Sequence, residues 1–316
     1  MEGCKLNDIF PFLSNCRGLI RRSVNPLKMR QHVRSQRRAV VDKMWFPYLE
    51  GYNAALESEP AEVAALLQEL PYDVRAVMYE GAYTAFAAKD ILEDEGWNRL
   101  KALSIDVPEK IPVMFQGIGG ALSQLQVSPE IYRSITESFY GWMSLDSYGC
   151  HEGYFRWNQA IQRQKVPHGL TALGQRAFDQ GIGRAIWLIG VADPTFIANL
   201  ISEFPLERRA DLWSGVGLMV GYWGAVDSTD MRKFRKFSRK WRSHLQQGVA
   251  LATHVRVEAQ SVPDYTEGAC EVICDADYGE VASLAGYCIN SLGEPLTTSK
   301  LFLKWKMDIT NTFSCN

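Results

Sequence analysis

Polar side chains able to move protons are concentrated in one short stretch of the chain. It contains Asp146, His151 and Glu152, and Asp179 and Arg184 follow downstream. A histidine beside carboxylates can transfer protons near neutral pH or bind a metal ion. The stretch therefore indicates acid–base catalysis or, as buried histidines more often show, structural hydrogen bonding.

Spacing along the chain predicts how these groups are oriented. Gly149 lies between Asp146 and His151, which favours a bend that turns both side chains toward one point rather than an uninterrupted helix. Asp179 and Arg184 are five residues apart, a spacing that makes an ion pair along one helix poor. Each of these two residues is therefore expected to have another partner.

A second set of polar residues comes directly before a series of glycines. Because equivalent positions of a helical repeat lie on one continuous surface, these residues are expected to form a polar stripe. If the stripe lines an apolar cavity, desolvation raises the carboxyl pKa values of Glu80 and Glu152 toward the range useful for a general acid. The alternative is that the set caps or bridges neighbouring helices. Its members are Glu50, Glu80, Gln116, Glu152, Gln180, Ser214 and Gln247.

These two sets together define the candidate site. The predicted catalytic groups are Glu80, His151, Glu152 and Asp179. The predicted substrate-binding residues are Asp146, Tyr148, Gln180, Arg184, Asp211 and Trp213. We expect this site to hold no metal and to need no cofactor.

The sequence gives less support to other familiar types of site. Asp90, Glu93 and Asp94 form an acidic run that would suit Mg²⁺ and a diphosphate substrate, although a solvated helix end is the interpretation we favour. Cys270 and Cys274 have no second pair at zinc-ligand spacing and are predicted to be buried thiols. The dinucleotide fingerprint, the Walker lysine and the Gly-x-Ser-x-Gly elbow are missing.

The elements that must position the site are helices centred on the glycines. Residues 69–81 and 203–215 are near-duplicates, in which Glu, Pro, Arg, Ala and Gly recur in register. Glycine inside a helix costs up to about 1 kcal/mol relative to alanine, so close helix packing must compensate. A unit of about 34 residues is typical of helical hairpins in solenoid arrays. The expected fold is all-α, with internally duplicated tandem hairpins in an open superhelix or a closed toroid.

Shorter helices are expected between the glycine helices, with proline or an N-terminal cap at their starts. These are Pro60–Leu70, Pro129–Tyr140, Pro194–Phe204 and Asp230–Gln246. The short β-branched run at 253–257 is interpreted as a helix end or loop. The predicted organisation is a basic arm over residues 1–38 and one repeat domain over 39–316, with halves at about 39–170 and 171–316.

Composition fits a folded, cytoplasmic protein. Hydrophobic residues make up 47% of the chain and aromatic residues 11%, which is enough for a large core. The longest apolar runs are too short to cross a bilayer, and the start of the chain lacks the features of a signal peptide. Seven scattered cysteines favour free thiols in a reducing compartment.

Charge is distributed unevenly although the net charge is only −2. Eight Lys or Arg residues lie in Arg17–Arg38 and seven in Arg232–Arg242, and neither segment contains an acid. Residues 231–245 would form a helix with an aromatic stripe and a basic back, which suits an acidic partner or a membrane surface. A core-facing repeat helix is the favoured alternative. Nucleic acid is not expected, because the rest of the chain is acidic.

Several blocks resemble the domain-of-unknown-function family 1702, best known from bacterial gene clusters for enediyne polyketides. They are residues 50–56, 79–82, 145–155, 178–187 and 208–218, and the resemblance covers roughly Arg38 to Phe313. It implies a bacterial source and a role in specialised metabolism on a polyene-like precursor. The family supplies no catalytic residues. This chain departs from the family pattern at Tyr79 and at 116–121.

The sequence is compatible with two functions. The first is an enzyme that holds a hydrophobic polyene or isoprenoid-like chain in an all-α cavity for acid–base cyclisation or isomerisation. The second is a non-catalytic helical-repeat scaffold that docks a synthase or a membrane surface. An enzyme needs an enclosed pocket with convergent polar groups.

Overall fold

The computed structural model describes residues 35–94, 96–106, 111–293 and 295–315, and within these ranges the chain is all-α, without strands. The basic arm expected over residues 1–38 lies almost entirely outside them. Among the described helices, none is both long enough and apolar enough to cross a bilayer.

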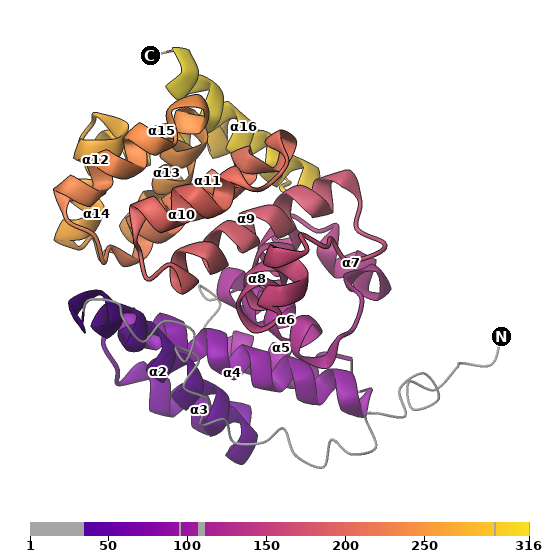
Figure 1. Ribbon diagram of the computed structural model, residues 1–316. Helices are drawn as coiled ribbons and strands as arrows, with labels where there is room; N and C mark the ends of the chain where they lie inside the picture. Colours follow the sequence, from indigo (N-terminus) through magenta and orange to yellow (C-terminus); the bar gives the residue numbers. More distant parts are fainter. Residues whose placement is uncertain (1–34, 95, 107–110, 294, 316) are drawn as a thin grey trace.

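Seven long helices follow one another as a continuous stack, each packed mainly on the next (Figure 1). The glycine-containing series is α2 (Ser35–Glu57), α4 (Tyr72–Glu93), α6 (Ile111–Leu125), α8 (Gly141–Phe155), α9 (Ala172–Ile189), α11 (Leu206–Trp223) and α13 (Arg242–Glu258). Two further helices, α15 (Tyr278–Asn290) and α16 (Ser299–Cys315), complete the chain.

Shorter elements connect the stack. They are α3 (Pro60–Gln68), α5 (Asn98–Asp106), the 3₁₀ helix η4 (Pro129–Tyr132), α7 (Arg133–Thr136), the π-helix η5 (Asn158–Gln162), α10 (Pro194–Ser202), α12 (Ser228–Phe237), the 3₁₀ helix η6 (Arg239–Trp241), α14 (Asp264–Ala269) and the π-helix η7 (Cys270–Cys274). The proline starts of α3 and α10 are confirmed, and the Asp193 carboxylate caps α10 by accepting from two backbone amides at 3.0 Å.

Glycines allow neighbouring helices in the stack to touch backbone to backbone. A Cβ on Gly181 would lie 1.9 Å from the carbonyl oxygen of Asp146, and one on Gly215 would lie 2.0 Å from that of Gln180. The same 2.0 Å contact occurs at Gly51 and Gly81 between α2 and α4. No side chain fits at such distances, so close approach explains why glycine is kept inside these helices.

Two expected helices are broken, and one expected bend is missing. The segment Asp230–Gln246 is wrong as one helix, because the backbone leaves helical geometry at Ser238 and Trp241. This break lets α13 join the stack, so the aromatic stripe is split between elements. Pro129–Tyr140 likewise breaks into η4 and α7 at Tyr132. By contrast, α8 continues through Gly149, where a Cβ would lie 2.2 Å from the carbonyl oxygen of Phe178, so this glycine permits close helix packing and does not bend the chain.

The C-terminal helix α16 folds back over the stack. It runs from α7 toward α15 in Figure 1 and packs against α8, α9, α13 and α15. Its buried face carries Phe302, Trp305, Lys306 and Ile309. The ring of Phe302 stacks on that of Trp142 with centroids 5.8 Å apart. This return contact makes α16 a cover for the later part of the stack.

A small apolar cluster lies apart from the main core. It consists of Tyr48, Leu49 and Val77 on α2 and α4, with Trp45 and Trp223 packed against it. We call it the second cluster. Because Trp223 ends α11, the second cluster joins the first two helices of the stack to a helix far along the chain.

Candidate functional site

The residues before the glycines form a hydrogen-bonded row through the later helices. The Gln180 amide donates to Asp146 Oδ2 at 2.8 Å. The Ser214 hydroxyl lies 3.1 Å from Gln180 Oε1 and 2.8 Å from Gln247 Oε1. All four side chains are buried. The predicted polar stripe therefore exists across α8, α9, α11 and α13, and we call this part the closed stretch.

The sequence placed the α8 member of the series at Glu152, and this register is wrong. Gly181 contacts the carbonyl of Asp146 in the way that Gly215 contacts that of Gln180, so Asp146 is the equivalent residue. Glu152 lies outside the row. Its Oε1 accepts from Ser123 at 2.8 Å and from the Arg156 guanidinium at 2.7 Å, which ties α6 to the end of α8. This carboxylate has a structural role in the described fold.

Asp179 and Arg184 each have a partner outside their own helix, as the spacing predicts. The Arg208 Nε donates to both carboxylate oxygens of Asp179 at 3.0 Å, and Arg184 donates to Asp146 Oδ1 at 3.2 Å. Burial raises the pKa of Asp179 to about 6, although Arg208 opposes the shift. Asp179 thus holds α9 to α11.

Asp211 is another predicted site residue held by cations. The Arg176 side chain donates to its two oxygens at 2.9 and 3.2 Å. Trp213 is fully buried in the core, and the Tyr148 ring packs 6.1 Å from that of Phe178. Burial raises the pKa of the Tyr148 hydroxyl, so this group stays protonated. These residues contribute more to packing than to an accessible binding surface.

A lysine that the sequence analysis missed completes the closed stretch. Lys306 on α16 is only 2% exposed, and its ammonium donates to Gln180 Oε1 and lies 3.9 Å from Asp211 Oδ1. Its Nζ is also 4.3 Å from the centre of the Trp142 ring, a cation–π contact. Burial lowers the pKa of Lys306 to about 8, with Asp211 opposing the shift.

Earlier in the stack the residues before the glycines are accessible, although on α2 the position equivalent to Gln180 is Tyr48, whose carbonyl Gly81 contacts. Glu50 is exposed, and Glu80 and Gln116 are partly exposed. We call these three residues the open stretch. Burial raises the pKa of the Glu80 carboxyl, while Arg184 lowers it and Asp146 raises it again. Glu80 therefore lies in the electrostatic field of the Asp146–Arg184 pair, where the two stretches meet.

The structure brings His151 to the Glu80 side of the molecule rather than toward Asp146. A Cβ on Gly120 would lie 3.0 Å from His151 Nε2 and 2.9 Å from Thr84 Oγ1. Thr84 is one turn beyond Glu80 and donates to its backbone carbonyl at 2.8 Å. Asp146 and His151 diverge because α8 is an uninterrupted helix, in which residues five apart occupy different faces.

His151 contacts two aromatic rings, one of which, Tyr48, belongs to the second cluster. The His151 ring centroid lies 5.8 Å from that of Tyr48 and 5.6 Å from that of Phe155. Val77 is one helical turn before Glu80 and belongs to the same cluster. The arrangement combines a carboxyl group of raised pKa, an imidazole and apolar aromatic surface, a set suited to protonating an apolar molecule.

The acidic run that suited Mg²⁺ has a structural role. Asp90 Oδ2 accepts from the backbone amides of Arg99 and Leu100 at 3.0 and 3.3 Å, which fixes the start of α5. The Arg99 guanidinium also pairs with Asp90 and Glu93. Within the described ranges, no group of three or more His, Cys, Asp or Glu residues is placed to hold a metal ion.

Comparison with known proteins assigns the chain to a family. Residues 25–313 match the family described as "Protein of unknown function (DUF1702)". Neither the curated proteins nor the solved structures contain a significant match.

Proposed function

This chain belongs to the DUF1702 family, and we propose that it is an enzyme that protonates an apolar, unsaturated chain, with Glu80 as the acid. The observation that carries the proposal is that this carboxyl, whose pKa is raised by burial, lies one helical turn after Val77 of the second cluster. A carboxyl whose pKa is raised holds its proton to a higher pH and can act as a general acid. Aromatic faces nearby stabilise developing positive charge.

The proposed reaction balances without a cofactor. Glu80 donates its proton to a carbon–carbon double bond and leaves a carbocation and a carboxylate. A second double bond of the same chain attacks the cation and closes a ring, or the cation loses a proton directly. The proton lost from carbon returns to the Glu80 carboxylate and exchanges with solvent before the next turnover, so that cyclisation or isomerisation leaves the enzyme unchanged.

His151 is proposed to orient the substrate beside Glu80. In this view Glu152 and Asp179 position helices instead of transferring protons, because each is engaged by an arginine. The resemblance to proteins of enediyne gene clusters supports a polyene as the substrate and a place in bacterial specialised metabolism.

The test compares Glu80 with Glu50, an exposed carboxyl on the neighbouring helix α2. Wild type, Glu80→Gln and Glu50→Gln would each be purified and incubated with an apolar extract of cells that produce the protein, and the products separated by chromatography and identified by mass spectrometry. We expect wild type and Glu50→Gln to convert one component to an isomer of equal mass, and folded Glu80→Gln to leave it unconverted. Equal conversion by all three proteins would refute the role of Glu80.

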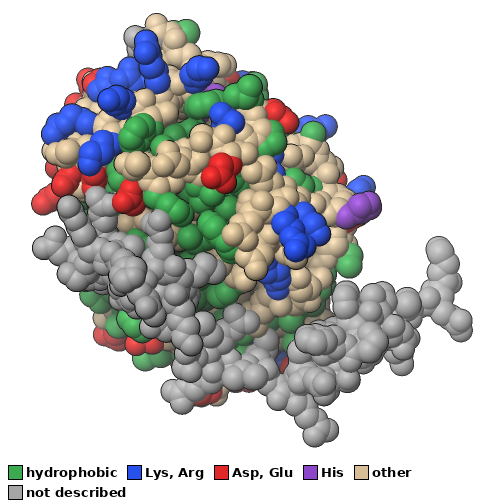
Figure 2. All heavy atoms as spheres, in the orientation of Figure 1, with side chains coloured by type: hydrophobic (Ala, Val, Ile, Leu, Met, Phe, Trp, Pro, Cys, Tyr) green, Lys and Arg blue, Asp and Glu red, His purple; other side chains and the backbone are tan. Residues whose placement is uncertain are grey.

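A scaffold function is favoured by a different observation. Lys and Arg side chains gather over α12 at the upper left of Figure 2, and Phe237 within this segment is 38% exposed. Such a surface suits an acidic synthase domain or an anionic membrane. A scaffold would keep its function in Glu80→Gln and lose it when Arg239 and Lys240 are changed to Glu.

A further inference from the structure

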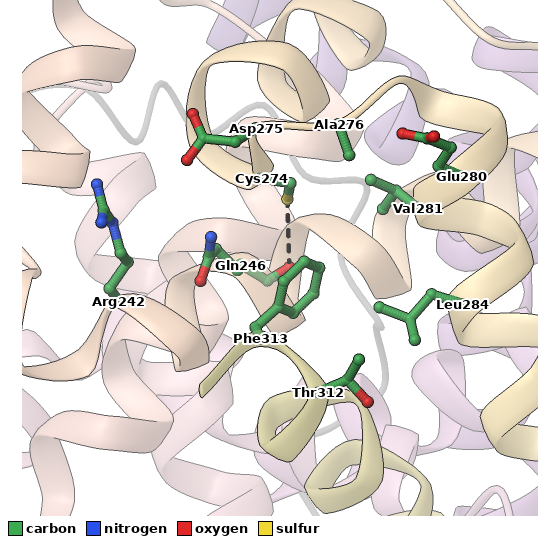
Figure 3. Close-up of a pocket in the computed structure, with 10 residues that line it drawn as sticks. All are labelled: Arg242, Gln246, Cys274, Asp275, Ala276, Glu280, Val281, Leu284, Thr312 and Phe313. Carbon is green, nitrogen blue, oxygen red and sulfur yellow. Dashed lines mark hydrogen bonds between the residues drawn. The ribbon is translucent and has the colours of Figure 1, made fainter. Parts of the chain in front are cut away.

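A pocket of about 430 Å³ opens at the far end of the stack, away from Glu80. Its walls come from α13, η7, α15 and α16 (Figure 3). The lining residues are Arg242, Gln246, Cys274, Asp275, Ala276, Glu280, Val281, Leu284, Thr312 and Phe313. None of them belongs to the site predicted from the sequence. The volume is within the range of about 300–1,000 Å³ typical of small-molecule sites.

One wall of the pocket is an irregular segment held firmly in place. The π-helix η7 ends at Asp275, whose φ of 57° is left-handed. The Arg235 guanidinium donates to the carboxylate of Asp275 and to the carbonyl of Val272 at 3.0 Å. π-Helical turns occur frequently at functional sites. Here the wide turn brings Asp275 and Ala276 to the edge of the pocket.

Most polar groups of the lining are already used inside the protein. Asp275 is bound by Arg235, and Glu280 accepts from the backbone amide of Asp277 in the capping box of α15. Thr312 donates to the carbonyl of Asp308 at 3.0 Å. A cationic ligand would therefore find its carboxylate partners occupied.

Two polar groups of α13 have no such partner in the described part of the chain. The Gln246 amide nitrogen donates to the carbonyl of Ile273 at 3.0 Å, which fixes the amide with Oε1 as the other atom. Gln246 is 6% exposed, and this Oε1 is buried without a hydrogen bond. A buried acceptor without a donor costs about 1–3 kcal/mol, so a ligand hydroxyl at this point would be favourable.

Arg242 is the cationic counterpart of Gln246. It is exposed, and no ion pair to it occurs among the described residues. Arg242 and Gln246 are one turn apart on α13, and Figure 3 shows the Gln246 amide between Arg242 and the ring of Phe313. Val281 and Leu284 lie on the opposite side of that ring. The lining thus changes from cation to acceptor to apolar surface.

We propose that this pocket binds an apolar carboxylate that carries a hydroxyl group near its head. The carboxylate pairs with the Arg242 guanidinium, and the hydroxyl donates to Gln246 Oε1. The hydrocarbon part packs against Val281, Leu284 and Phe313. The site is independent of Glu80 and would exist in an enzyme or in a scaffold.

Isothermal titration calorimetry of the full chain tests the proposal with 3-hydroxydecanoate. Decanoate lacks the hydroxyl and methyl 3-hydroxydecanoate lacks the charge, so each comparison removes one contact without changing the protein. We expect 3-hydroxydecanoate to bind wild type at least about tenfold more tightly than either comparator, the effect of one charge-assisted or buried hydrogen bond. Absence of binding, or equal affinity for the three compounds, would overturn the proposal.

Protein variants locate the binding site. Arg242→Ala is expected to weaken 3-hydroxydecanoate binding by about tenfold or more, whereas Arg239→Ala, an exposed cation of the same basic segment outside the lining, leaves it unchanged. Leu284→Trp fills the apolar part and is expected to abolish binding. Equal affinities of the Arg242→Ala and Arg239→Ala proteins would show that general charge attraction causes the binding, and the proposed site would be wrong.

Discussion

The open and closed stretches are two parts of one series of polar residues, and they lie in two environments. Both lie beside glycines whose helices touch through their backbones, at Gly81 in the open stretch and Gly181 in the closed one. In the closed stretch, α16 covers the row and Lys306 bonds to it. In the open stretch, Glu80 keeps partial exposure, one helical turn after Val77 of the second cluster. The difference shows that the repeat determines where a polar group lies, while the covering element determines whether it can meet a ligand.

The largest expected effect tests what the two stretches share. Gly81→Ala and Gly181→Ala each place a methyl group about 2 Å from a backbone carbonyl. Helices cannot relieve such a clash by moving one side chain, so we expect each change to lower the free energy of unfolding by about 3 kcal/mol or more. Urea denaturation measures it.

Gly286→Ala is the matched control, because a Cβ there meets nothing within 4 Å. It should leave stability unchanged or raise it by up to about 1 kcal/mol. A large loss at Gly181 with none at Gly81 would mean that the two stretches are held together differently.

The second prediction concerns Lys306, the residue of α16 that bonds to the closed stretch and not to the open one. The pKa of Lys306 is lowered to about 8 from 10.5, so between these values the unfolded chain binds more protons than the folded one. Stability from this group therefore rises with pH across that interval, by up to about 3 kcal/mol. Lys306→Met should remove the rise and be the more stable protein at pH 7.

The difference between wild type and Lys306→Met, measured by urea denaturation from pH 7 to 10, isolates this group. Lys304→Met, an exposed lysine two residues earlier, is the control and should follow the wild type. A difference that does not change with pH would show that Lys306 is held as a stable cation.

A smaller effect is expected from Glu80. Because its pKa is raised, the folded protein binds this proton more tightly than the unfolded chain, and the associated stability is lost as pH rises from 4.5 through the raised value. Glu80→Gln should flatten this part of the pH–stability curve and therefore gain stability relative to wild type between pH 4.5 and pH 7, while Glu50→Gln leaves the curve as in wild type. A curve unaltered by Glu80→Gln would place its carboxyl in ordinary solvent.

Local signals in the sequence were sufficient for the all-α class, for the proline starts at Pro60 and Pro194, and for the helix packing through glycines. They also predicted that Asp179 and Arg184 pair with other elements. These features depend on neighbouring residues or on a single spacing rule.

Local sequence signals did not predict the features that depend on contacts between distant parts of the chain. The register in α8 was wrong because Gly153 follows Glu152, whereas backbone contacts assign the position to Asp146. The return of α16 could not be read locally, although one signal was present, since Lys306 lies on the apolar face with Phe302 and Ile309. Nor does any local signal show that η7 is π-helical or that a pocket lies beside it.

The most direct measurement of the central claim is solvent deuterium in the product. Wild type and Glu80→Gln would be incubated with the apolar extract in D₂O, and the converted component analysed by mass spectrometry. Protonation of carbon by Glu80 requires that wild type place one solvent deuterium on carbon and that the variant place none. Conversion by wild type without deuterium, or deuterium uptake that persists in Glu80→Gln, would contradict the account.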